Sequence, residues 1–180
     1  MSRVSMLREQ FREAHQFLES TMEGVASEQA HWTPPGMALP IGAHYGHIVI
    51  LEDFSVGGML TSNGPLFASR RAGRTGFSAL PPLPDPASPG IPNFAAWARD
   101  VKVDLPTTRQ YAREVYEATD RYLAALDDVA LDRDLDLSAV GGGRRTVGWL
   151  LAHPMLANIN MHCGEISCLK GLQGAKGYPA

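Results

Sequence analysis

Residues 146–172 read TVGWLLAHPMLANINMHCGEISCLKGL, and their spacing predicts a long helix. Six side chains recur three or four positions apart and share one helical face: Leu151, Met155, Asn158, His162, Ile166 and Leu169. Thr146 is a suitable N-cap, and Pro154 should kink the helix because it cannot donate one backbone hydrogen bond. The stretch therefore predicts a one-sided helix whose apolar face carries an amide and an imidazole.

Three other segments predict long helices. Residues 7–25 and 107–129 each carry one apolar stripe at helical spacing, and residues 41–60, which follow Pro40, are apolar around most of the helix. A short extended piece is expected within residues 135–140. Four helices of about 20 residues would each be about 30 Å long. The arrangement that buries four such faces is an all-α four-helix bundle.

A long proline-rich connection separates the second and third of these helices. Residues 62–104 contain seven prolines between Pro65 and Pro92, which disfavours both helix and sheet. Within this connection, Asn93 can cap a short helix over residues 94–101. A connection of this length permits a crossover between the helices instead of a tight hairpin.

Composition limits the classes of function. A chain of 180 residues suits one domain over residues 1–180. The net charge of -3 disfavours nucleic acid as a partner, and SRRAGR at 69–74 is too short a basic cluster to change this. No apolar run reaches the ~18 residues of a membrane span, so no membrane partner is expected. Cys163 and Cys168 are too few for a disulfide framework, which favours a cytoplasmic location.

Polar side chains on the predicted buried faces are the candidate functional residues. His47 shares a face with apolar residues and should point inward, whereas His44, three positions earlier, is ambiguous. Asn158, His162 and Glu165 lie within two turns of one another. Because burying such groups is costly unless they are bonded, two interpretations stay open. One is a hydrogen-bonded cluster that fixes helix register, and the other is a metal or substrate site that faces His47.

The remaining histidines are expected to have structural roles. His15 lies at the edge of an apolar stripe and should be half-exposed, and His31 lies in a turn where capping or packing is favoured. His153 lies about half a turn away from His162 around the helix. Cys163 is expected to be a small core side chain. The sequence carries no P-loop, no GxSxG elbow and no GxGxxG between a strand and a helix.

Three stretches resemble the DinB-like (DinB/YfiT-type) superfamily of metalloenzymes. They are HWTPPG at 31–36, IGAHYGHIVILEDF at 41–54, and residues 146–179, of which HCGEISCLKGLQGAKGYP is the most specific part. The resemblance implies a four-helix bundle with up-down-down-up topology that is often a homodimer. It also implies a divalent metal, commonly zinc or nickel, held by three histidines on the second and fourth helices.

Carried onto this chain, the resemblance implies metal ligation by His47 and His162, with Asn158 at the position of the remaining family histidine. An amide oxygen is a poor ligand for these metals, so Glu165 or His44 could serve in its place. Otherwise Glu165 is expected to act as a general base or to orient a ligand.

Two functions follow from this reading. The first is an enzyme, a metal-dependent hydrolase or thiol S-transferase that acts on a small-molecule substrate or thiol. In such an enzyme the metal lowers the pKa of a bound water or thiol. The alternative is a non-catalytic, metal-free bundle that binds a small molecule or is associated with stress, with a metal site made degenerate by Asn158.

Overall fold

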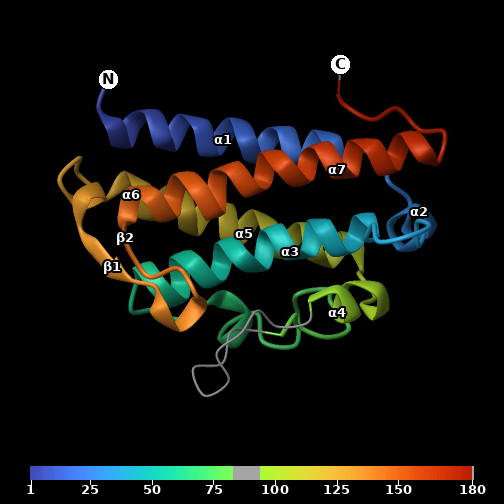
Figure 1. Cartoon of the computed structure of the whole chain (residues 1–180), viewed down its shortest axis with the longest axis horizontal. Helices are drawn as coiled ribbons and strands as arrows, with labels where there is room; N and C mark the ends of the chain where they lie inside the picture. Colours follow the sequence, from blue (N-terminus) through green and yellow to red (C-terminus); the bar gives the residue numbers. More distant parts are fainter. Residues whose placement is uncertain (83–93, 180) are drawn as a thin grey trace.

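The protein is mostly helical in the computed structural model, which describes residues 1–82 and 94–179. Among these residues, long helices run along the longest axis of the molecule (Figure 1), namely α1 (Arg3–Thr21), α3 (Ile41–Asp53), α5 (Leu105–Ala124) and α7 (Asn158–Leu172). Helix α1 packs against α5 and α7, and α3 packs against the same two helices. The mostly helical fold predicted from the sequence is confirmed.

Two of these helices are joined to π-helical segments. Helix α3 continues directly into η1 (Phe54–Leu60), and α7 is preceded by α6 (Val147–Leu150) and η5 (Leu151–Ala157). Thr146 caps α6 as predicted, because its hydroxyl accepts a hydrogen bond from the Trp149 backbone N–H at 3.1 Å. Pro154 lies inside η5, so the perturbation expected at this proline takes the form of a widened turn.

Two of the predicted helices end earlier than their apolar stripes suggest. Helix α1 ends at Thr21, although Met22 and Val25 stay buried, because the chain turns at Gly24 with a positive φ of 73°. Helix α5 ends at Ala124, and Val129 is exposed instead of continuing the stripe. In both cases the apolar period continues beyond the last residue of the helix, because periodicity does not mark where a helix ends.

A small antiparallel hairpin precedes α6. Strand β1 (Asp134–Asp136) pairs with β2 (Arg144–Thr146), and Leu135 lies opposite Arg145. The extended piece expected within 135–140 therefore covers only its first residues, since η4 (Ser138–Val140) follows. Between the strands the chain reverses at Gly141 and Gly143, which both have positive φ. The hairpin lies beside the end of α3 and η1 (Figure 1).

The other short elements lie in the connections: α2 (Ser27–His31), η2 (Leu66–Ala68), α4 (Phe94–Asp100) and η3 (Ala130–Asp132). Helix α4 confirms the short helix predicted in the proline-rich connection. Its expected cap, Asn93, and residues 83–93 of that connection lie outside the described residues. Within the part of the chain that the structure describes, no helix is long and apolar enough to cross a lipid bilayer.

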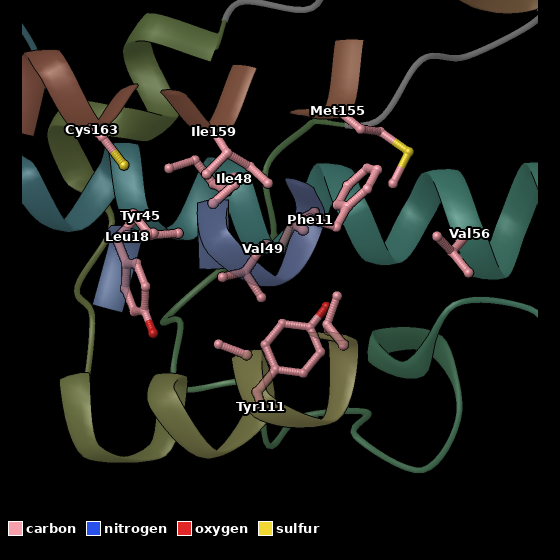
Figure 2. Close-up of a cluster of buried hydrophobic side chains, with 14 of the residues drawn as sticks. Phe11, Leu18, Tyr45, Ile48, Val49, Val56, Tyr111, Met155, Ile159 and Cys163 are labelled. Carbon is pink, nitrogen blue, oxygen red and sulfur yellow. The ribbon is translucent and has the colours of Figure 1, made fainter. Parts of the chain in front are cut away.

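The core lies between the long helices (Figure 2). Phe11 of α1, Ile48 of α3, Tyr111 of α5 and Ile159 of α7 are all buried there. Tyr111 also donates a hydrogen bond of 2.6 Å from its hydroxyl to Asp53 Oδ2. The core therefore joins all four long helices, and this hydrogen bond ties α5 to the end of α3.

Candidate metal centre

The histidines of α3 and the polar residues of α7 meet where these two helices pack. His44 lies in the first turn of α3, after the N-cap Pro40, and His47 follows three residues later. His162 and Glu165 have the same spacing on α7. Since residues three apart share a helical face, each helix presents its pair toward one side.

Three ligand atoms from these helices converge. His44 Nδ1 lies 3.0 Å from His162 Nδ1 and 3.1 Å from Glu165 Oε2. His162 Nδ1 also forms a hydrogen bond with the same Glu165 oxygen. One ligand atom from each of the three residues lies within 4.8 Å of the other two. This cluster, His44, His162 and Glu165, is called the His/Glu cluster below.

The donor set and spacing of the His/Glu cluster fit a divalent metal. Imidazole nitrogen and carboxylate oxygen are common ligands of zinc, and imidazole also suits nickel. Two ligand atoms bound tetrahedrally to zinc at about 2.0–2.1 Å lie about 3.3 Å apart. The distances of 3.0 and 3.1 Å from His44 Nδ1 are close to that value. The cluster could therefore hold a metal ion once the hydrogen-bonded atoms of His162 and Glu165 move apart to the same separation.

Burial keeps His44 in the protonation state that metal binding needs. Desolvation lowers the pKa of His44, the Glu165 carboxylate opposes this effect, and the nearby His162 lowers the pKa as well, so that the net pKa is about 4. The side chain of His44 is 7% exposed, whereas that of Glu165 is 52% exposed. His44 therefore presents a neutral nitrogen at neutral pH, and the cluster opens to solvent on the side of Glu165.

His47 lies beside the cluster and not among its converging atoms. Its ring centroid is 5.1 Å from that of His162 in an edge-on arrangement, and its ring also meets Phe94 at 4.6 Å. Burial lowers the pKa of His47 to about 4, with smaller contributions from His162 and His44. The structure thus brings residues 47 and 162 together, and a direct role of His47 as a metal ligand stays a prediction.

Asn158 is the first residue of α7, one turn before His162, and it is half-buried. Its side chain makes no hydrogen bond with another residue in the described ranges 1–82 and 94–179. Its predicted role as a ligand therefore stays a prediction. Glu165, predicted as a general base, has an oxygen inside the cluster and is close enough to serve as a ligand.

Sequence reasoning left the position of His44 open. Helix α3 is buried on nearly all sides, so no single apolar stripe shows which way a side chain points. The usable signal was the spacing of His44 and His47, which places both toward the same neighbouring helix. The direction of the His44 side chain was therefore ambiguous because α3 is buried on nearly all sides.

The expectation that His15 is half-exposed is wrong. His15 is 8% exposed, its Nε2 lies 2.9 Å from Glu52 Oε2, and its ring stacks on Tyr116 at 3.9 Å. The hydroxyl of Thr119 donates to the other oxygen of Glu52 at 2.5 Å. His15 is buried because α1 packs on α5 and covers the edge of the predicted stripe. The signal for this pairing was Glu52, an acidic residue next to the apolar run of residues 48–51.

Two other side chains have the predicted structural roles. His31 packs in its turn, where its Nδ1 bonds the Ser27 carbonyl oxygen at 2.7 Å and its Nε2 accepts from the Val103 N–H at 2.9 Å. Cys163 is a buried core thiol, and burial raises its pKa to about 11. Cys163 is therefore a poor nucleophile at neutral pH, although it follows His162 in sequence.

Comparison with known proteins gives the fold and the family. The chain is similar to a crystal structure of a conserved protein from Enterococcus faecalis, with a TM-score of 0.78 and 18% sequence identity over 96% of this chain and 97% of that chain. At this identity the likeness shows the fold alone. No curated protein matches the sequence significantly. A family model described as the DinB superfamily matches residues 10–166, and the chain belongs to the DinB superfamily.

Proposed function

We propose that the chain binds a divalent metal ion, zinc or nickel, at the His/Glu cluster and acts on a small molecule there. The observation that carries the proposal is the convergence of three ligand atoms within 4.8 Å from helices more than 100 residues apart in sequence. Membership of the DinB superfamily supports it. His47, whose ring meets that of His162 edge-on, and Asn158, one turn before His162 on α7, are candidates for a further ligand.

The fold supports this reading as one domain over residues 1–180. The packing of α1 and of α3 against both α5 and α7 supports an up-down-down-up four-helix bundle. The proline-rich connection then carries the chain between α3 and α5. We further propose that the protein forms a homodimer and lies in the cytoplasm. The cytoplasmic location is supported by the exposed free thiol of Cys168, since a reducing compartment preserves such a thiol.

The reaction proposed is that of a metal-dependent hydrolase or thiol S-transferase. A bound divalent metal supplies a lowered pKa for a water or thiol, which makes a nucleophile at neutral pH. Among the chain's own groups, Glu165 is exposed enough to exchange a proton with solvent, and before metal binds, its hydrogen bond to His162 Nδ1 orients that ring. The neutral imidazole of His44 supplies the ligand atom from α3.

A second function is favoured by Asn158. The position where the family places a third histidine carries an amide here, and the His/Glu cluster already has hydrogen bonds between its own members. In this alternative Asn158, His162 and His47 form a polar network in a metal-free, non-catalytic protein that binds a small molecule or serves under stress.

Metal analysis of protein purified without a histidine tag separates the two functions. We expect near-stoichiometric zinc or nickel in the wild type and in His153→Ala, a matched control because His153 is exposed and outside the cluster. His44→Ala and His162→Ala should lose the metal. If the wild type stays metal-free after dialysis against zinc and Asn158→His gains metal, the site is degenerate and the second function holds.

A further inference from the structure

A cavity of about 340 Å³ lies beside the His/Glu cluster, between the π-helical ends of α3 and α7. Such a volume is within the range of about 300–1,000 Å³ that small-molecule pockets occupy. Most of its wall is apolar, with Phe54, Met59, Phe94, Trp149 and Leu150 among the lining residues. The hairpin closes another side through residues 137, 140 and 142.

His47 connects this cavity to the cluster. Its ring is part of the cavity wall, and the same ring meets His162 edge-on at a centroid distance of 5.1 Å. On its other side it meets Phe94, which also lines the cavity. A molecule that fills the cavity would therefore place one end against His47, next to the cluster.

Both π-helical segments contribute to the wall. Phe54 and Met59 come from η1, and Pro154 comes from η5. A π-helical turn has a wider backbone spiral than an α-helical turn and is found frequently at functional sites. The backbone of η1 lies close to the loop that follows it. A Cβ at Gly57 would therefore be only 2.7 Å from the Gly64 carbonyl oxygen. Two such turns on neighbouring helices therefore shape the same cavity.

The charge of the lining limits what can bind. Among the described residues that line the cavity, none is an aspartate, glutamate, lysine or arginine. The hydroxyl of Ser55, the ring of His47 and the indole N–H of Trp149 are its side-chain hydrogen-bonding groups among the described residues. An ionic group buried here would lack a partner at a large cost in free energy, whereas an aromatic or aliphatic group would be accommodated.

We propose that this cavity binds the uncharged apolar body of the substrate and directs its polar, reacting end past His47 to the His/Glu cluster. This inference rests on the proposed metal site. It narrows the substrate to molecules with an aromatic or aliphatic portion, and it makes His47 a positioning residue at the boundary between cavity and cluster. A thiol that is charged along its length would have to lie outside the cavity.

A series of alkyl hydroxamates tests the proposal on zinc-loaded protein. The hydroxamate is a metal-binding head, and the alkyl tail would enter the cavity. Since each buried methylene contributes about 0.8 kcal/mol, affinity should rise about fourfold per methylene from acetohydroxamate to hexanohydroxamate. Calorimetry measures these affinities directly. An affinity that does not change with tail length, on protein shown to hold zinc, would overturn the cavity proposal and leave the metal site standing.

A pair of matched variants locates the tail. Val140→Trp places a large side chain at the cavity wall, where Val140 is 36% exposed and tolerant of change. Val129→Trp is the control, because Val129 is 76% exposed and does not line the cavity. We expect Val140→Trp to weaken hexanohydroxamate at least tenfold while acetohydroxamate binds as before. Equal affinities in the two variants would contradict the proposal.

A binding experiment without metal distinguishes failure of the cavity proposal from failure of the proposed metal site. The probe is 2-naphthol, an uncharged aromatic molecule, followed by NMR on protein treated with chelator. If zinc never binds but 2-naphthol binds and Val140→Trp abolishes its binding, the cavity stands and the metal site fails. If 2-naphthol shifts no resonance of the cavity lining in the wild type, the cavity proposal fails whatever the metal content.

Discussion

Removing the Asp53 carboxylate should strongly destabilise the protein, because three donors depend on it. Asp53 is the last residue of α3 and is 2% exposed. It accepts hydrogen bonds from the backbone N–H groups of Leu66 at 2.8 Å and Phe67 at 3.0 Å, and from the Tyr111 hydroxyl at 2.6 Å. The carboxylate thus ties the start of η1 to η2 and α5.

The size of the effect follows from those three bonds. A buried donor left without an acceptor costs about 1–3 kcal/mol. Leu66 is only half-buried, so water can replace its bond, while Phe67 and Tyr111 are buried. Relief of the cost of burying the carboxylate offsets part of the loss. We therefore expect Asp53→Ala to lower the free energy of unfolding by about 3 kcal/mol.

Urea unfolding followed by circular dichroism measures this loss, with Tyr111→Phe as the matched variant. Tyr111→Phe removes one hydroxyl and keeps the buried ring, so it should cost about 1.5 kcal/mol. The double variant should lose less than the sum of the two, because both changes remove the same bond. The reasoning is refuted if Asp53→Ala stays within about 0.5 kcal/mol of the wild type, or if the two losses simply add.

Three further predictions concern the metal, the thiols and the second buried acid. Zinc at 100 times its dissociation constant should raise the free energy of unfolding of the wild type and of His153→Ala by about 2.7 kcal/mol, and chelator should reverse the gain. The same gain in His162→Ala would place the metal elsewhere. Cys168 should react with a disulfide reagent at pH 8, whereas Cys163 should not. The pKa of Cys163, about 11, keeps its thiol protonated, and the thiolate forms only as the pH rises toward that value. Rapid reaction of both thiols in the folded protein would contradict this. Glu52→Ala should cost about 2–4 kcal/mol in urea unfolding, because it leaves its histidine and threonine partners unpaired; a neutral effect would show that water replaces those bonds.

The long helices could be predicted because each carries a periodic signal that its packing uses. Thr146 and Pro154 mark the start and the irregular turn of the last helix in the sequence, and both have those roles in the structure. The limits of α1 and α5 could not be predicted, because Met22 and Val129 continue the period beyond the helix. Burial follows the neighbours of a residue in space, and a periodic pattern records only its neighbours along the helix.

The candidate site was predictable only in part for the same reason. His162 interrupts an apolar stripe, so its inward position is visible in the sequence, whereas Glu165, which was also expected on a buried face, is exposed at the solvent side of the cluster. Helix α3 is buried on almost every side, and His44 therefore has no outward face to be contrasted with. The cavity was beyond sequence reasoning, because its wall combines α3, η1, residues 81–82, α4, the hairpin loop, α6 and η5. Such a surface exists only after all these segments have packed.

The polar residues of α3 show why the His/Glu cluster differs from an ordinary buried network. Glu52 and Asp53 each face groups that can donate hydrogen bonds, so their pairing is complete without any ligand. At His44, by contrast, two ring nitrogens and a carboxylate oxygen converge, and all three carry lone pairs when unprotonated. A single proton can bridge only one pair of these atoms at a time. A divalent cation would bind all three atoms together, and this convergence supports the proposed metal at this point of α3 instead of at its acidic residues Glu52 and Asp53.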